Sequence, residues 1–181
     1  MATTSLKAAI LTAAVLAGLA GAGSNMSWRS GPQPGDPPLH LVLHTSSNRL
    51  DVFRGDDLEK SYTVSVGRPG YETPTGSYAI SEVVWNPTWV PPNSGWAAGK
   101  SPKGPGEPGN PMGRVKMFFS NMYYIHGTQD VGQLGEPVSH GCVRMSNSDA
   151  VELAQMVGGG DGGDSGEERA VRVSPVPLEV K

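Results

Sequence analysis

A thiol and two imidazoles occur in the sequence in a pattern suited to acyl transfer. Cys142 follows His140 by two residues, and His126 lies further upstream. A thiol attacks a carbonyl as its thiolate, and a nearby imidazole that takes the thiol proton forms this species and pairs with it. His140 shares a face with Cys142 if the segment is extended, whereas His126 comes alongside only if the chain between them loops back. The residue types predict a cysteine nucleophile with one histidine as its base.

Small residues around these groups fit the same chemistry. Gly127 and Gly141 leave room for a substrate backbone, and amide N–H groups near Gly141 and Cys142 are suited to holding the oxyanion of a tetrahedral intermediate. Cys142 is the only cysteine, so it forms no internal disulfide. Considered without its neighbours, Cys142 fits three roles: an inert buried side chain, an intermolecular bridge or a reactive thiol.

A metal site is the main chemical alternative. His126, His140 and Cys142 are all zinc-ligand types. No fourth ligand is evident, however, and the His-x-Cys spacing lies outside the usual zinc arrangements. We therefore expect no metal and no other cofactor.

Longer segments surround the chemical residues. Residues 125–128 read Ile-His-Gly-Thr, and residues 138–145 read Val-Ser-His-Gly-Cys-Val-Arg-Met. Upstream lie three further Pro-containing segments, in order 67–76, 86–92 and 105–113, of which the first and third also contain Gly. Together they cover about residues 39–157 and closely resemble the L,D-transpeptidase family with a YkuD-type catalytic domain.

The resemblance implies a fold, an activity and residue roles. It implies a mainly β, sandwich-like domain with Cys142 in a cleft beneath a lid. Family members attack the third residue of a peptidoglycan stem through a thioester, so peptidoglycan stem peptides are the expected partner. It also implies that His126 is the base, oriented by the Gly127 carbonyl, and that His140 and Ser139 support the cysteine. In the expected thiolate–imidazolium pair, Cys142 should react at pH values below ~8.5, the pKa of a free thiol.

The product is less closely specified than the site. A 3-3 cross-link between two stems is the leading expectation. Hydrolysis by an L,D-carboxypeptidase or endopeptidase, or attachment of a protein to the wall, would use the same residues. A wall-binding module with a relic site is disfavoured because Cys142, His126 and the glycines are intact. Arg144 stands where part of the family has Asn, and its guanidinium suits either a substrate carboxylate or a structural salt bridge.

Composition and periodicity favour short strands and long loops. The 181 residues include 25 Gly and 16 Pro, and alternating apolar residues predict strands at 39–44, 50–53, 62–66, 77–84, 115–119, 123–126 and 171–173. One helix is predicted between Asn147 as its N-cap and Gly158 as its C-terminal stop, from the helical spacing of Ala150, Leu153, Ala154 and Val157. The Pro- and Gly-rich stretch 85–114 is too long for an ordinary connection and reads as a lid. Trp89 within it is a candidate for substrate contact or for anchoring this loop.

The ends of the chain define the expected domain limits. Residues 1–22 read as a signal peptide, because their apolar run is shorter than the ~20 residues of a spanning helix; the alternative is a weak membrane anchor. We expect a linker at 23–38, the catalytic domain at 39–175 and a loose tail at 176–181. Export to the periplasm or cell envelope follows. The net charge of −3, without a basic run, argues against nucleic-acid binding. Nothing indicates an oligomeric state.

Overall fold

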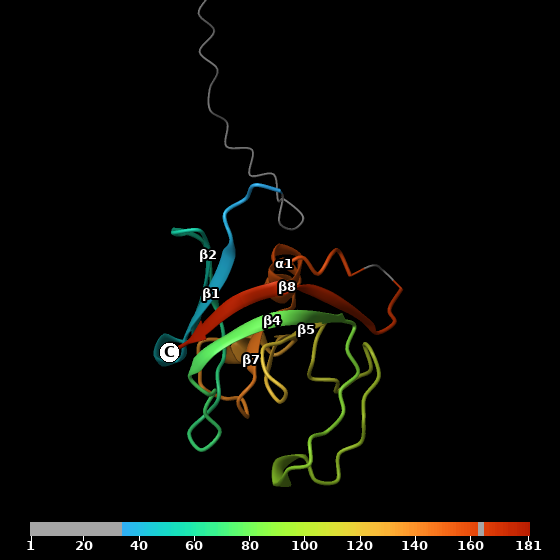
Figure 1. The fold of residues 1–181 in the computed structure, drawn as a ribbon. Coiled ribbons are helices and arrows are strands. Elements are labelled where there is room, and N and C mark those ends of the chain that lie inside the picture. The colour runs from blue at the N-terminus through green and yellow to red at the C-terminus, as the bar shows by residue number, and fades with distance from the viewer. Residues whose placement is uncertain (1–33, 163–164) are drawn as a thin grey trace, which may run out of the picture.

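The computed structural model describes residues 34–162 and 165–181 (Figure 1). The expected signal peptide and residues 23–33 of the expected linker lie outside these ranges. The rest of that linker is turn and irregular chain, and the Pro38 carbonyl accepts a hydrogen bond from Gly55 N–H at 2.9 Å. In the part of the chain that the structure describes, no helix has the length and apolar character needed to cross a bilayer.

One eight-stranded sheet forms most of the domain, in the order β3-β2-β1-β8-β4-β5-β6-β7 (Figure 1). The β1·β8 and β6·β7 pairs are parallel, and the other neighbours are antiparallel. The mainly β class is therefore confirmed. The strands are β1 (Leu39–His44), β2 (Arg49–Arg54), β3 (Asp57–Thr63), β4 (Gly76–Trp85), β5 (Val115–Phe118), β6 (Tyr124–Thr128), β7 (Val143–Ser146) and β8 (Arg169–Val180).

The predicted first hairpin is present as β1 and β2. Leu39, Leu41 and Leu43 alternate along β1 and are all buried, as expected for a strand with one face on the core. The connection, η1 (Thr45–Ser47), ends at Asn48, which has a left-handed φ of 50° that asparagine tolerates better than most residues.

The expected loose tail at 176–181 is wrong. Residues 176–180 belong to β8, which lies between β1 and β4 near the middle of the sheet. Val176, Leu178 and Val180 are buried and alternate with exposed residues. Two prolines concealed this strand, because proline lacks the N–H that a ladder needs. Both are accommodated: Pro175 lies at an irregularity opposite β4, and Pro177 precedes the residues paired with β1.

The two ends of the sheet are joined by the segment that follows β3. Ser65 and Arg144 exchange backbone hydrogen bonds of 2.9 Å in both directions, and Ser139 N–H donates to the Val66 carbonyl at 3.0 Å. The chain that leaves one edge strand thus pairs with the other edge strand, β7. The sheet nearly closes on itself around one core, which agrees with the sandwich-like expectation.

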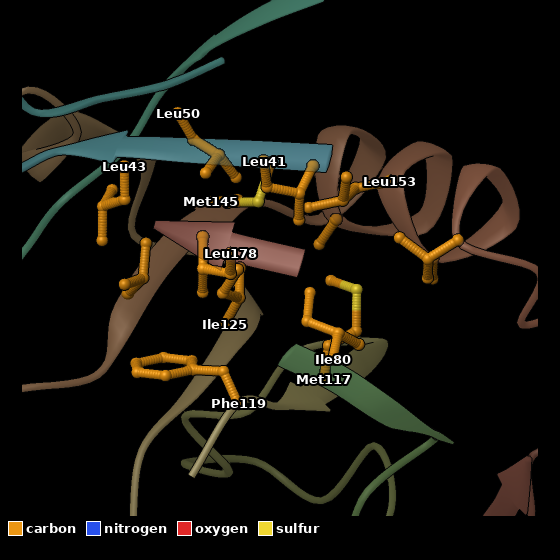
Figure 2. Close-up of a cluster of buried hydrophobic side chains, with 14 of the residues drawn as sticks. Leu41, Leu43, Leu50, Ile80, Met117, Phe119, Ile125, Met145, Leu153 and Leu178 are labelled. Carbon is orange, nitrogen blue, oxygen red and sulfur yellow. The ribbon is translucent and has the colours of Figure 1, made fainter. Parts of the chain in front are cut away.

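Helix α1 (Asn147–Met156) follows β7 directly and packs on the core through Ala150, Leu153 and Ala154. Its N-cap is Ser146, whose Oγ accepts from Asp149 N–H at 3.1 Å, rather than the predicted Asn147. Figure 2 shows side chains from the strands and the helix meeting in this core. Among them are Leu41, Leu50, Ile80, Met117, Ile125, Met145, Leu153 and Leu178.

Candidate active site

Strands β5, β6 and β7 present two rows of side chains on the face away from the core. The core-facing residues between them, Met117, Ile125 and Val143, are fully buried. Alternation along each strand therefore directs the neighbouring residues the other way. Strand register aligns the rows across the sheet, with Cys142 directly before β7. One row contains Lys116, His126 and Arg144, and the other contains Phe118, Tyr124 and Cys142.

His126 has the orientation required of a proton acceptor. Its side chain is buried, and Nδ1–H donates to the Gly127 carbonyl at 2.9 Å. In the neutral ring this bond places the proton on Nδ1 and the lone pair on Nε2. Burial lowers the pKa of His126 to about 4, and the charges of Arg144 and Lys116 add to this shift, whereas the Gly127 and Pro111 carbonyls oppose it. The imidazole is therefore neutral at neutral pH.

The thiol of Cys142 is neutral in the same conditions. Burial raises its pKa, although hydrogen bonds from the Tyr124 amide and phenol and the Arg144 charge partly oppose this shift. Burial thus favours a neutral thiol and a neutral imidazole over the charged forms of the expected thiolate–imidazolium pair. The physical reason is that desolvation penalises both ionised forms.

Hydrogen bonds fix the turn that carries the cysteine. The buried Ser139 Oγ accepts from Gly141 N–H at 3.0 Å and donates to the Cys142 carbonyl at 2.5 Å. Thr73 Oγ1 donates to the Gly141 carbonyl at 2.9 Å. Gly141 has φ +107°, and a Cβ there would lie 2.5 Å from the Tyr123 ring, so only glycine fits. Because Ser139 uses the Gly141 amide, the Cys142 amide is the better placed of the two expected oxyanion donors.

His140 lies two residues before Cys142 but is engaged elsewhere. Arg68 Nη2 is 2.9 Å from His140 Nε2, and because guanidinium only donates, this nitrogen must accept. Trp96 stacks on the ring at 4.1 Å, and Tyr71 meets it edge-on. Burial lowers the pKa of His140, and the charges of Arg68, Arg144 and Lys100 lower it further. His140 therefore has a supporting position.

Three cations surround His140. Arg68 comes from the segment after β3, Lys100 from the β4–β5 loop and Arg144 from β7. Lys100 Nζ also lies 5.1 Å from the centre of the Trp96 ring. Across the described residues, none of the three forms a salt bridge with a carboxylate. The region around His140 and Cys142 is therefore positively charged and suited to an anionic group.

The predicted Trp89 lies within the loop and is buried. Its backbone exchanges hydrogen bonds of 2.8 and 2.9 Å with Lys103, so it anchors the loop, while Trp96 is the tryptophan that reaches His140. Sequence reasoning assigned no role to Tyr124 or Arg68. Tyr124 had a usable signal, because it lies two residues before His126 on a strand and so shares its face.

A metal centre finds no support in the geometry. Within 34–162 and 165–181, no three His, Cys, Asp or Glu side chains gather in a way that would hold an ion. His126 and His140 instead use ring nitrogens in the hydrogen bonds described above.

Comparison with known proteins gives consistent matches. The sequence model of the YkuD family, the L,D-transpeptidase catalytic domain, matches residues 38–176. The putative L,D-transpeptidase YkuD of Bacillus subtilis is 31% identical over 130 residues, which cover 71% of this chain and 66% of that protein. The probable L,D-transpeptidase YbiS of Escherichia coli K12 is 30% identical over 125 residues, 65% of this chain and 41% of that protein. The chain thus spans at most about two thirds of these two relatives.

Solved structures share the fold at lower identity. An L,D-transpeptidase from Mycobacterium smegmatis matches with a TM-score of 0.58 and 17% identity, covering 79% of this chain and 58% of that one. The catalytic domain of the Enterococcus faecium L,D-transpeptidase matches with a TM-score of 0.56 and 16% identity, covering 79% of this chain and 96% of that one.

Proposed function

The chain belongs to the L,D-transpeptidase family with a YkuD-type catalytic domain, and from this premise we propose that it forms 3-3 cross-links between peptidoglycan stem peptides through a Cys142 thioester. One observation carries the assignment of roles: in His126 the Gly127 carbonyl holds the proton on Nδ1, so that Nε2 of the neutral ring is unprotonated, whereas Arg68 engages Nε2 of His140. The substrate is proposed from the family, and the cations near Cys142 support a donor that carries carboxylates.

The proposed acylation begins from the neutral pair. The Cys142 proton moves to His126 Nε2 as the sulfur attacks the carbonyl carbon of the third stem residue, and the C–S bond forms while the carbonyl oxygen becomes an oxyanion. The Cys142 amide donates to this oxyanion. When the intermediate collapses, the C–N bond to the terminal D-Ala breaks, and the departing amine takes the proton from His126. A thioester remains.

The second step reverses the proton path. The amine of an acceptor stem attacks the thioester carbon and gives a proton to His126, after which the C–S bond breaks. The departing thiolate recovers its proton from His126, which returns the resting pair. Hydrolysis follows if water attacks instead, and wall attachment follows if a protein amine attacks.

A guanidinium can hold a carboxylate through two parallel hydrogen bonds. We assign this role to Arg144, because its charge acts on Cys142, His126 and His140 alike. Arg68 and Lys100 extend the positive region toward the loop. Trp96 closes the loop over His140.

The test is incubation of the mature protein with purified disaccharide tetrapeptides, followed by mass analysis. We expect cross-linked dimers that lack one D-Ala. Tripeptides without dimers would indicate L,D-carboxypeptidase activity instead of transpeptidation. Conjugates formed only with an added protein would indicate wall attachment. The absence of all products, and of a mass adduct with faropenem, would overturn the proposal. The faropenem arm is motivated by a solved Mycobacterium tuberculosis L,D-transpeptidase that holds a faropenem-derived adduct.

We also propose export to the periplasm or cell envelope, where peptidoglycan is found. The basis is the three-part pattern of residues 1–22, with a short apolar stretch that ends in small residues. N-terminal sequencing of the protein from fractionated cells should find a start near Gly23. An intact N-terminus in the membrane fraction would indicate the anchor instead.

A further inference from the structure

Tyr124 occupies the position next to the nucleophile. The parallel register of β6 and β7 pairs Ile125 with Val143, which places Tyr124 beside Cys142. Its ring is held by two edge-on neighbours, Phe118 with ring centres 5.3 Å apart and His126 at 5.7 Å. The phenol is thus fixed in the row that contains the sulfur.

Strand register makes Tyr124 the neighbour of Cys142, close enough for its backbone N–H and its phenol both to lower the pKa of the Cys142 thiol. Burial raises the pKa of Tyr124, and the neighbouring Cys142 raises it further. The phenol therefore keeps its proton at neutral pH and acts as a donor, while His126 accepts the thiol proton. A buried thiolate needs such donors, because it has lost the hydrogen bonds of water.

We propose that Tyr124 is a catalytic residue that donates its phenol O–H to Cys142 Sγ, stabilising the thiolate as it forms during attack and again as it leaves the thioester. This role rests on the proposed thioester chemistry. The proton balance is unchanged: the thiol proton moves to His126 Nε2, and Tyr124 keeps its own. In the resting state the same bond orients the thiol.

The direct test measures the rate of Cys142 alkylation by iodoacetamide against pH, followed by mass. We expect Tyr124→Phe, which keeps the ring, to move the profile to higher pH and to lower the rate at pH 7 about tenfold, the effect of one pKa unit. Tyr78→Phe is the matched control, because the Tyr78 phenol bonds the Thr75 carbonyl on the exposed surface. Equal profiles for wild type and a folded Tyr124→Phe would overturn the proposal.

A second measurement does not depend on that variant folding. Incorporation of 3-fluorotyrosine makes the phenol more acidic and a stronger donor, so the wild-type profile should move to lower pH. No such movement would contradict the proposal. Alkylation requires no peptidoglycan, so failure here is distinct from failure of the transpeptidation assay. If wild type forms dimers and Tyr124→Phe turns over at the wild-type rate, only the role of Tyr124 is rejected.

Discussion

The candidate site has two halves that are built differently. Cys142, Tyr124 and His126 belong to neighbouring strands or adjoin them, and ladder register sets their spacing. Arg68, Trp96 and Lys100 come from loops and meet at His140 through one hydrogen bond, ring stacking and charge. The strand-borne half contains the proposed proton transfer. The loop-borne half contains cations and a ring suited to a substrate, to which strand β7 adds Arg144.

This difference separates chemistry from recognition. A nucleophile and base must keep their geometry within fractions of an ångström, and a hydrogen-bonded sheet provides that rigidity. Loops tolerate changes of sequence and length more readily, so they suit the groups that select a substrate. Substitutions in the first half should therefore reduce the chemical step, whereas those in the second should mainly change substrate affinity.

The largest effect is expected from Cys142→Ala. Removing the nucleophile should lower dimer formation by at least about four orders of magnitude, because no other group replaces the sulfur. Thermal unfolding should stay close to wild type, since the substitution removes a single atom from a half-buried position. Mass analysis of muropeptides and of faropenem adducts measures the loss. Turnover or an adduct in this variant would place the chemistry elsewhere.

The next largest effects are expected from the two histidines, whose alanine variants should differ in turnover. His126→Ala should reduce turnover by about 10²–10⁴-fold, the usual contribution of a positioned base. His140→Ala should retain more activity and should chiefly raise KM, because it removes the platform for Trp96 and Arg68. Steady-state kinetics on tetrapeptide donors measures both. The reverse order of effects would make His140 the base and would remove the distinction between the two halves.

The strand-borne half also predicts a pH profile. His126 must be neutral to accept the proton, so kcat/KM should fall as pH drops through its pKa of about 4, well below an ordinary histidine. Lys116→Met removes one of the charges that lower this pKa, so the acid limb should move upward by a few tenths of a unit. Profiles of faropenem acylation provide the measurement. An acid limb near 6.5 would contradict the neutral-pair arrangement.

In the loop-borne half, Trp96→Ala should raise KM about tenfold and leave kcat within about twofold, because it removes a stacking contact without touching the sulfur. Trp89→Phe is a useful partner, since it keeps an aromatic anchor inside the loop. A fall in kcat at constant KM for Trp96→Ala would show that the loop takes part in the chemical step.

Much of the strand-borne half could be predicted from the sequence. Alternation located the strands. The assignment of His126 as the partner of Cys142 came from the family resemblance, because spacing left both histidines open. The resting charge state could not be predicted, because it depends on burial and on the flanking Lys116 and Arg144, which strand pairing alone brings together. Composition also gave no sign of the order in the glycine-rich run that follows α1. Gly159 and Gly162 lie against Trp85, whose Nε1–H donates to the Gly159 carbonyl.

The β1–β2–β3 end of the sheet lies outside both halves, so a substitution there serves as a control for the comparison between them. The buried Asp51 carboxylate accepts hydrogen bonds from Ser61 at 2.6 Å and from Arg49 at 2.9 Å. Burial alone would raise the pKa of Asp51, but these bonds, with the Arg49 and His44 charges, hold it below its ordinary value.

Asp51→Asn should therefore lower the free energy of unfolding at pH 7 by about 1–3 kcal/mol. A depressed folded pKa means that this stabilisation is present above the ordinary carboxyl pKa of 3.8 and is lost as pH falls through the folded value. The difference from wild type should shrink toward pH 3 in urea titrations. Asp57→Asn, on the exposed start of β3, should change stability by under about 0.5 kcal/mol. Because Asp51 lies on β2, which pairs with β1 and β3 and not with β6 or β7, the alkylation profile of Cys142 in Asp51→Asn should match wild type. A shifted profile would mean that the strand-borne half depends on the far end of the sheet.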